Sequence, residues 1–367
     1  MTFSQDAMKL PTYFELKNAL QITTEQANFI KKSRETLKNI LNFQDNRLLI
    51  IVGPCSIHDT ISAKEFAENL KELALEISDT CFLIMRTYCE KPRTSTGWKG
   101  FLYDPFLNDT AQIENGIVRT RQLLLDLAAI GVPTAVEFLD PLTANYYDDL
   151  VSWGSIGART SSSQIHRQLA SSLAMPIGFK NGIAGNISSA IDGVLTASQP
   201  QVYIGVDNNG NKSILKSNGN TDIHIVLRGG ESGPNYYAEN IQVALEKLTS
   251  ENLPMRVIVD CSHHNSNKRP LEQIPVFKNV LNQIIGGNTY IRGLMLESHL
   301  YLGHQSLVLE KHLLKYGVSI TDPCLDWENT KILLKYAAEK LKQKKQNSNL
   351  VTLSQNLDYA LNCDEMI

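Results

Sequence analysis

Eight polar residues in this 367-residue sequence each stand at or just beyond the end of a short apolar run. They offer a thiol, three guanidinium groups, an ammonium, an imidazole and two carboxylates, which together can bind anions and a metal ion. In chain order they are Cys55, Arg86, Asp140, Arg159, Lys180, Arg228, His263 and Glu297. Side chains of these types, placed alike after each run, predict an active site assembled from many segments of the chain.

Four of these residues are cations that could converge on one pocket. They are Arg86, Arg159, Lys180 and Arg228. Buried guanidinium groups need anionic partners, and their planar fork matches phosphate and carboxylate. The segment 91–100, KPRTSTGWKG, follows the second run, and its cations, hydroxyls, Pro and Gly suit a rigid loop around a second anion. Taken singly, each arginine would more often form a surface salt bridge; together they favour one or two phosphorylated substrates.

A second set of candidates could hold a metal ion. Its members are Cys55, His263, Glu297 and Asp322. One thiolate, one imidazole and two carboxylates suit a divalent first-row ion. The candidates are far apart in sequence and have no diagnostic spacing, and a buried cysteine is more often a small apolar residue than a ligand. His58 and His264 lie close to these candidates in sequence and could contact the metal ligands without binding the metal themselves.

The apolar runs themselves predict the fold. Runs of four to six apolar residues without strict alternation are typical of strands buried on both faces, and hence of a parallel sheet. Most pairs of runs are separated by a segment long enough for a helix, such as 62–77 or 109–130. Eight such strands with intervening helices predict an α/β protein with a (β/α)8 TIM barrel, whose functional groups gather at the carboxyl ends of the strands.

Residues 48–341 are expected to form the catalytic barrel, between an N-terminal extension (1–47) and a C-terminal tail (342–367). In the extension, helices are expected over 13–20 and 24–42, the second begun by a Thr-Thr-Glu-Gln start. Two alternating runs around Asn208-Asn209-Gly210 predict a β-hairpin inserted at about 201–222. A final helix is expected over 327–345, followed by a loosely attached helical segment.

Composition favours a cytoplasmic enzyme. The net charge of -3 argues against general binding to nucleic acid or to an anionic membrane surface. The apolar runs are far too short to span a bilayer, and the first residues, MTFSQDAMKL, do not resemble a signal or transit peptide. Six cysteines without a CxxC pair or regular spacing indicate a reduced protein.

Several long motifs resemble one known family. They are GPCSIHD (53–59), EKPRTSTGWKG (90–100), GARTSSSQIHRQLAS (157–171), GFKNG (178–182), HIVLRGG (224–230), DCSHHNS (260–266), ESHL (297–300) and SITDPCLDWE (319–328). From about Leu10 to about Leu341 the sequence is similar to the class I, microbial 3-deoxy-D-arabino-heptulosonate 7-phosphate (DAHP) synthases. The resemblance implies condensation of phosphoenolpyruvate with erythrose 4-phosphate, the entry step of the shikimate pathway. A homodimer or homotetramer is expected.

The resemblance also implies roles for individual residues. It places one divalent ion (Mn²⁺, Fe²⁺, Co²⁺ or Zn²⁺) on Cys55, His263, Glu297 and Asp322. It places phosphoenolpyruvate on Arg86, Lys91, Arg159, Lys180 and Arg228, and erythrose 4-phosphate on Arg93 and Thr94. For the chemistry, Lys91 is the expected proton donor to the aldehyde oxygen and Asp322 or a metal-bound water the base, with His263 also in the catalytic group.

Aromatic-sensitive members of this family have a feedback pocket, and here its expected positions are altered. They are Pro141, Asn145, Ala174, Tyr203, Gly205 and Leu215. The hydroxyl usual at the positions of Ala174 and Gly205 is absent, so the ordinary response to phenylalanine is expected to be weak.

Two alternatives remain open from the sequence. A 3-deoxy-D-manno-octulosonate 8-phosphate synthase shares the barrel and the phosphoenolpyruvate chemistry, but the KPRT segment (91–94) and the long N-terminal extension argue against it. A metabolite-binding barrel without turnover is the other alternative, although every proposed catalytic position is filled. A chorismate mutase fusion is disfavoured because the segment after Leu341 is too short for that domain.

Overall fold

The computed structural model describes residues 8–93, 96–308 and 310–364, with side chains up to residue 347 except that of Lys311. Eight parallel strands close into a barrel, and each of the eight apolar runs supplies one of them. They are β1 (Leu48–Gly53), β2 (Cys81–Arg86), β3 (Thr134–Glu137), β4 (Trp153–Ile156), β5 (Ile177–Lys180), β8 (Ile223–Leu227), β9 (Val257–Asp260) and β10 (Ile291–Glu297). The predicted (β/α)8 barrel is confirmed. The third strand ends at Glu137, three residues before the predicted Asp140.

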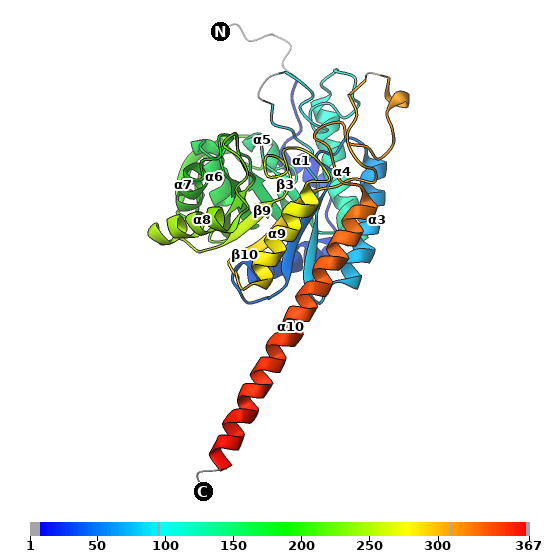
Figure 1. The fold of residues 1–367 in the computed structure, drawn as a ribbon. Helices are drawn as coiled ribbons and strands as arrows, with labels where there is room; N and C mark the ends of the chain where they lie inside the picture. The colour runs from blue at the N-terminus through cyan, green and yellow to red at the C-terminus, as the bar shows by residue number, and fades with distance from the viewer. Residues whose placement is uncertain (1–7, 94–95, 309, 365–367) are drawn as a thin grey trace.

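Helices surround the barrel (Figure 1). They are α3 (Thr60–Glu76), α4 (Ile113–Ile130), α5 (Pro141–Ala144), α6 (Gln164–Ser172), α7 (Ser188–Ala197), α8 (Ala238–Ser250), α9 (Gln273–Ile285) and α10 (Trp327–Asp364). The outward residues of the strands pack against these helices in one large apolar cluster. Asp59 shows how the sequence starts such a helix, because its carboxylate accepts hydrogen bonds from the backbone N–H groups of Ile61 and Ser62.

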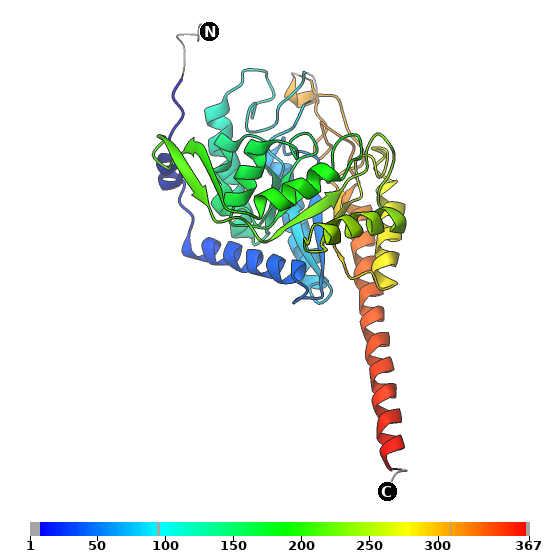
Figure 2. The same cartoon turned by 90° about the vertical axis from the view of Figure 1, so that its left-hand side faces the viewer.

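The interior of the barrel is filled by a second apolar cluster, and the N-terminal extension closes its lower end. The extension contains α1 (Tyr13–Ala19) and α2 (Thr24–Leu41), close to the predicted ranges, and Figure 2 shows α2 lying across the end of the barrel. Leu37 and Ile40 of α2 are fully buried in the same cluster as Trp153 and the inward residues of the other strands. The amino ends of the strands are therefore sealed, which leaves the carboxyl ends for function.

The inserted hairpin is confirmed as β6 (Gln201–Val206) and β7 (Lys212–Ser217), an antiparallel pair between α7 and β8. The extension contacts its tip, where the backbone N–H of Phe14 donates to the carbonyl of Asn208 (3.0 Å). Ile204 and Ile214 face each other across the pair and are 85% and 74% exposed, whereas Tyr203 and Leu215 on the opposite face are half-buried.

The last helix is longer than predicted. It was expected to end at Lys345, but α10 continues without a break to Asp364, beyond the expected domain boundary at 342, and extends away from the barrel in Figure 1. The solvated run KLKQKKQ (340–346) therefore lies within a helix, because lysine and glutamine are good helix formers. The domain boundary itself remains a prediction.

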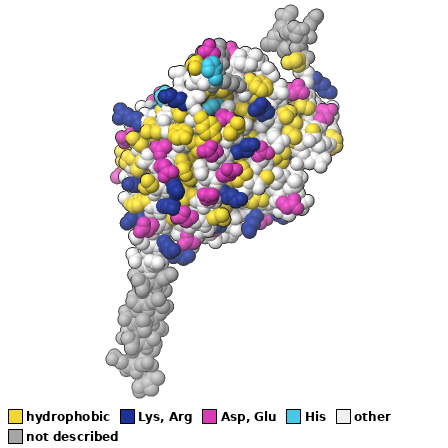
Figure 3. Space-filling model, turned by 90° about the vertical axis from the view of Figure 1, so that its right-hand side faces the viewer, with side chains coloured by type: hydrophobic (Ala, Val, Ile, Leu, Met, Phe, Trp, Pro, Cys, Tyr) yellow, Lys and Arg dark blue, Asp and Glu magenta, His cyan; other side chains and the backbone are white. Residues whose placement is uncertain are grey.

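On the face shown in Figure 3, Lys and Arg side chains are interspersed with Asp and Glu. A face dominated by basic residues would be typical of a nucleic-acid-binding protein, and this face has no such character. Among the helices of the described residues, none combines the length and apolar character needed to cross a membrane.

Arg292 of β10 fastens α2 to the barrel, and its removal should destabilise the fold. Its guanidinium is buried and donates to the backbone carbonyls of Ile40 (2.8 Å) and Asp45 (2.8 Å). Arg292→Met leaves these carbonyls unpaired, so we expect the free energy of unfolding to fall by about 2 kcal/mol. Urea denaturation followed by circular dichroism measures this change, with the exposed Arg269→Met as control. Equal stability of the two variants would contradict this role.

Candidate active site

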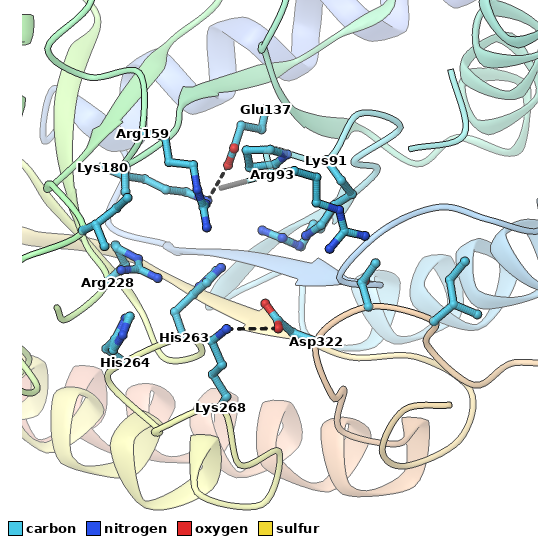
Figure 4. A pocket seen from close by; sticks show the side chains of 16 residues that line it. Lys91, Arg93, Glu137, Arg159, Lys180, Arg228, His263, His264, Lys268 and Asp322 are labelled. Atoms are coloured by element: carbon cyan, nitrogen blue, oxygen red, sulfur yellow. Dashed lines mark hydrogen bonds and ion pairs between the residues drawn. The ribbon is translucent and has the colours of Figure 1, made fainter. Parts of the chain in front are cut away.

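A cavity of about 320 Å³ at the carboxyl ends of the strands gathers most of the predicted site residues (Figure 4). Its cationic lining consists of Arg86, Lys91, Arg93, Arg159, Lys180, Arg228 and Lys268. Two carboxylates, Glu137 and Asp322, and two imidazoles, His263 and His264, also line it. The strong excess of cations makes the cavity suited to multiply charged anions. Thr94, also predicted here, lies outside the described residues.

Lys180, at the end of β5, is held by a carboxylate that the sequence analysis did not single out. Its Nζ lies 2.8 Å from Oε2 of Glu137, and both side chains are almost fully buried. Burial acts to raise the pKa of Glu137, but Lys180, together with Lys91 and Arg86, outweighs it and lowers that pKa to about 2. Gly157 makes room for the pair, because a Cβ there would lie 2.5 Å from Oε1 of Glu137. Both groups are therefore ionised at neutral pH.

Arg86, at the end of β2, is fixed on several sides. Its Nη2 donates to Oε1 of Glu297 (2.8 Å) and to the carbonyl of Cys55 (3.2 Å), and Nε donates to the carbonyl of Pro54 (3.2 Å). The guanidinium carbon lies 3.6 Å from the ring centroid of Tyr88, over which Lys180 also sits at 5.1 Å. The ring face of Tyr88 thus helps to hold two neighbouring cations at the floor of the cavity.

Three of the four predicted metal ligands come together. One ligand atom each of Cys55, Glu297 and Asp322 lies within 4.8 Å of the other two. Cys55 and Glu297 are buried, and Asp322 is half-buried. Burial and the charge of Glu297 raise the pKa of the Cys55 thiol, an arrangement that a bound cation would relieve by stabilising the thiolate. The donor set and its separations therefore fit a divalent metal ion.

His263, the fourth predicted ligand, lies beside this group. Its Nε2 is 3.7 Å from Oε1 of Glu297, and its Nδ1 is 2.9 Å from Oδ2 of the buried Asp260. A carboxylate on one ring nitrogen commonly orients the other nitrogen toward a metal. The backbone φ of His263 is 53°, in the left-handed region that non-glycine residues rarely adopt. The backbone at His263 is thus locally strained in the conformation that places this imidazole beside Glu297.

Two lysines lie against the metal group. Lys91 Nζ is 3.1 Å from Sγ of Cys55, and Lys268 Nζ is 3.4 Å from Oδ1 of Asp322. Burial acts to raise the pKa of Asp322, but Lys91, His263 and Lys268 together lower it to about 2. Burial likewise acts to lower the pKa of Lys91, while Cys55 and Glu297 raise it above its ordinary value. Asp322 is therefore ionised and Lys91 protonated at neutral pH.

Three buried asparagines connect the ends of β5, β8 and β9. Oδ1 of Asn181 accepts from the backbone N–H of Arg228 (2.8 Å) and from Nδ2 of Asn235 (3.2 Å). Oδ1 of Asn265 accepts from the backbone N–H of Asn235 (2.8 Å), and its Nδ2 donates to the carbonyl of Asp260 (2.8 Å). This network fixes the backbone around Arg228 and next to His263. It satisfies polar groups that would otherwise be buried without partners.

Seven contributors were not predicted as site residues: Tyr88, Glu137, Asn181, Asn235, Asp260, Asn265 and Lys268. A sequence signal existed for three of them, because Glu137, Asp260 and Asn181 stand at or directly after the ends of apolar runs. His264 lines the cavity. His58 packs instead against His299, with ring centroids 5.9 Å apart, outside this cavity. The described cysteines are free thiols: 55, 81, 89, 261 and 324.

The residues predicted for an altered effector pocket lie in one region away from the cavity. Pro141 and Asn145 are in and after α5, Ala174 is exposed between α6 and β5, and the others belong to the hairpin. Helix α6 contacts α5 and both hairpin strands. A Cβ at Gly205 would lie 2.5 Å from Cδ1 of Leu215, so this leucine occupies the space beside the missing side chain. Whether these residues bind an effector remains a prediction.

Comparison with known proteins agrees with this geometry. The model of the DAHP synthetase I family matches residues 19–335. A Phe-sensitive phospho-2-dehydro-3-deoxyheptonate aldolase of Escherichia coli K12 is 43% identical over 351 residues, covering 94% of this chain and all of the relative. The Trp-sensitive enzyme of the same strain is 44% identical over 329 residues, covering 90% and 94%. A solved phospho-2-dehydro-3-deoxyheptonate aldolase from Francisella tularensis superposes with a TM-score of 0.90 at 39% identity, covering 93% of this chain and 99% of the other. The chain therefore belongs to the DAHP synthetase I family.

Proposed function

We propose that this protein condenses phosphoenolpyruvate with D-erythrose 4-phosphate and water, giving DAHP and phosphate, the first step of the shikimate pathway. The observation that carries the proposal is a cavity lined by seven cationic residues and by Asp322, which together with Cys55 and Glu297 forms a thiol–carboxylate group suited to a metal ion. Relatives named phospho-2-dehydro-3-deoxyheptonate aldolase, 43% identical over nearly the whole chain, support this reaction.

Phosphoenolpyruvate would bind on the side of the cavity formed by β4, β5 and β8. Arg159, Lys180 and Arg228 line that side and can hold its phosphate, while Arg86 and Lys91 can neutralise its carboxylate together with Lys180. The hydrogen bonds that fix Arg86 and Lys180 in place before the substrate arrives reduce the ordering that binding requires.

Erythrose 4-phosphate would bind on the loop after β2. Arg93 is exposed and lines the cavity, and its Nε donates to the carbonyl of Trp98 (2.7 Å). Among the described residues no hydrogen bond engages its outer guanidinium nitrogens, which could bind a phosphate. Thr94 follows it in the chain and is the second proposed contact. The two substrates then lie on opposite walls of one cavity, so their encounter becomes an oriented one.

Cys55, His263, Glu297 and Asp322 would hold one divalent ion, Mn²⁺, Fe²⁺, Co²⁺ or Zn²⁺. When bound, the ion would supply Lewis acidity toward the sugar aldehyde. Asp260, whose Oδ2 lies 2.9 Å from Nδ1 of His263, already orients the imidazole for metal binding through its other nitrogen. Which of these four ions is bound depends on the availability of each metal in the cell as much as on the ligands.

The remaining chemistry falls to residues of the cavity. C3 of phosphoenolpyruvate attacks the aldehyde carbon, and Lys91, protonated beside Cys55, donates a proton to the aldehyde oxygen. Water then adds at C2 of the former phosphoenolpyruvate, and Asp322 would accept its proton. The new C2 hydroxyl then becomes a carbonyl as the C2–O bond to phosphate breaks. The hydroxyl proton leaves with the phosphate, which Arg159, Lys180 and Arg228 receive.

We also propose that the protein is a cytoplasmic homodimer or homotetramer. The family and the buried free thiols are consistent with a reducing compartment. Size-exclusion chromatography with light scattering distinguishes the dimer and the tetramer from a monomer.

A coupled assay tests the proposed reaction. Purified protein with Mn²⁺ should consume phosphoenolpyruvate when erythrose 4-phosphate is present, and much more slowly with arabinose 5-phosphate. Faster consumption with arabinose 5-phosphate would favour the octulosonate 8-phosphate synthase alternative. No consumption with either sugar would favour a binding protein without turnover.

The metal group makes a direct prediction. Removing metal with EDTA should abolish activity, and Mn²⁺, Co²⁺ or Fe²⁺ should restore it. Cys55→Ala should weaken metal binding by at least about tenfold, because loss of a residue that merely hydrogen-bonds to a metal ligand often lowers the affinity for the metal by that factor. Metal content after dialysis measures the effect, and the buried Cys81→Ala is the matched control because Cys81 lies outside the metal group. Full activity of the metal-free enzyme would refute this assignment.

The two walls of the cavity can be tested separately. Arg228→Ala should raise KM for phosphoenolpyruvate, and Arg93→Ala should chiefly raise KM for erythrose 4-phosphate, each by about ten- to a hundredfold for a lost bond to a charged group. Arg228 is preferable to Lys180 because replacing Lys180 would also leave Glu137 buried without its partner. If Arg93→Ala altered only the kinetics of phosphoenolpyruvate, the assignment of the loop would be wrong.

Feedback control is expected to be weak. Neither Ala174 nor Gly205 can donate or accept a side-chain hydrogen bond, and Leu215 fills the space beside Gly205. Loss of one bond to a charged ligand group costs about 1.5–3 kcal/mol, so inhibition by phenylalanine should be about ten- to a hundredfold weaker than with the hydroxyl present. Titration of activity with phenylalanine, tyrosine and tryptophan at low phosphoenolpyruvate measures this. Strong micromolar inhibition by phenylalanine would contradict the expectation.

A further inference from the structure

Glu90 is a buried carboxyl group directly next to a proposed catalytic residue, Lys91. It is 1% exposed and stands in the loop that follows β2. Its Oε1 accepts hydrogen bonds from Oγ1 of Thr143 (2.8 Å) and from the hydroxyl of Tyr147 (2.7 Å). Its Oε2 is buried and has no hydrogen-bond partner among the described residues. Removing a carboxyl group with an unpaired oxygen from water costs free energy, so we expect Glu90 to have a function that offsets this cost.

The loop that begins at Glu90 is tightly closed on itself. The backbone N–H of Lys91 donates to the carbonyl of Lys99 (2.9 Å), so the two arms of the loop run side by side. Gly100 has a φ of 109°, and a Cβ there would lie 2.4 Å from the carbonyl oxygen of Cys89 and 2.8 Å from Cα of Glu90. Because the arms are this close, a displacement of Glu90 would also move Lys91 and the rest of the loop.

On its other side, Glu90 is anchored to α5 and the residues just after it, a segment that the N-terminal extension contacts. Thr143 is in α5, and Tyr147 follows it. The hydroxyl of Tyr13 donates to the carbonyl of Leu142 (2.9 Å), and that of Tyr146 donates to the carbonyl of Pro11 (2.5 Å). The carboxyl group of Glu90 therefore connects the loop after β2 to α5, and the extension in turn holds α5 in place.

The surroundings of Glu90 set the pH at which its carboxyl group ionises. Burial raises the pKa of Glu90 to about 7; the hydroxyl donors Tyr147 and Thr143 oppose the rise, and the nearby Asp140 adds to it. The titratable hydroxyls of Tyr147 and Tyr103 and the thiol of Cys89 also face it, and burial raises the pKa of each well above neutrality. Glu90 is thus the group in this cluster that changes charge near neutral pH.

We propose that Glu90 is a positioning residue whose ionised carboxylate, held by Thr143 and Tyr147, fixes the loop that presents Lys91 and Arg93 to the substrates. An ionised carboxylate accepts hydrogen bonds about twice as strongly as a neutral group. Protonation weakens both bonds, loosens the loop and lowers kcat/KM for erythrose 4-phosphate. The inference rests on the proposed condensation and adds to it a means by which the loop, and with it the activity, responds to pH.

The test uses the full-length, Mn²⁺-loaded enzyme and Glu90→Gln, which keeps an oxygen acceptor but cannot ionise. At pH 8 we expect kcat/KM for erythrose 4-phosphate to be about three- to tenfold lower in Glu90→Gln than in wild type. At pH 6, where wild-type Glu90 is protonated, the two should agree. The wild-type profile should therefore have an inflection near pH 7 that the variant lacks, with a rise in KM contributing more than a fall in kcat.

A matched pair of threonine variants separates positioning from general damage. Thr143→Val removes one donor to the carboxylate, which should shift the inflection to higher pH because the ionised form loses a stabilising bond. Thr134→Val removes a hydroxyl that is also buried but donates to the carbonyl of Leu150 (3.1 Å), with no hydrogen bond to Glu90, so it should leave the inflection in place.

Fluorescence of Trp98, which lies in the same loop, provides a readout that does not need turnover. The difference in emission between the wild type and Trp98→Phe should titrate near pH 7, and it should not titrate in a Glu90→Gln background. An inflection that persists in Glu90→Gln, in activity or in emission, would overturn the inference. Wild-type protein that consumes no phosphoenolpyruvate at any pH would instead refute the proposed condensation, and the emission titration would still decide the role of Glu90.

Discussion

Two buried ion pairs at the carboxyl end of the barrel, Arg86–Glu297 and Lys180–Glu137, are the constraint on which the site depends. Each joins side chains from different strands and has a heavy-atom distance of 2.8 Å. An isolated charge in such a place would lose far more solvation than a protein can replace. Pairing lets the chain keep both cations in the interior, and the ring of Tyr88 supports them from one side. The surrounding cations can then be aimed at substrate anions.

This pairing also explains why the metal group and the anion site can adjoin each other. Glu297 is shared between them, because the same Oε1 that accepts from Arg86 lies 3.7 Å from Nε2 of His263. A cation bound by Cys55, Glu297 and Asp322 would thus sit next to fixed positive groups, whose repulsion the carboxylates reduce. Proximity of Lewis acid and anion-binding cations is what the proposed condensation requires.

The sequence predicted much of this arrangement because strand ends in a parallel barrel meet at one edge. Each apolar run became a strand, and the predicted cations that follow the runs share one cavity. Glu137 was missed because the third run was read as continuing to Asp140, whereas the strand ends at the earlier carboxylate. Tyr88, Lys268 and Asn235 could not be found this way, since their positions follow from loop conformation and have no periodic signal. The extent of α10 was missed because its polar stretch was taken as an end of the helix.

The N-terminal extension contributes in two places that lie far apart in the barrel. Its helix α2 seals the amino end through Leu37 and Ile40, and its α1 segment holds α5, whose Thr143 contacts Glu90 in the loop after β2. The stability of the barrel and the conformation of the loop after β2 are therefore both connected to a segment outside the (β/α)8 core.

The central claim is that one cavity holds a divalent ion and a phosphorylated substrate side by side. Anomalous diffraction from crystals soaked with Mn²⁺ and phosphoenolpyruvate tests it most directly. The account predicts a manganese peak among Cys55, His263, Glu297 and Asp322, with the phosphate of phosphoenolpyruvate against Lys180 and Arg228. A manganese peak elsewhere, or phosphoenolpyruvate bound outside this cavity, would contradict it.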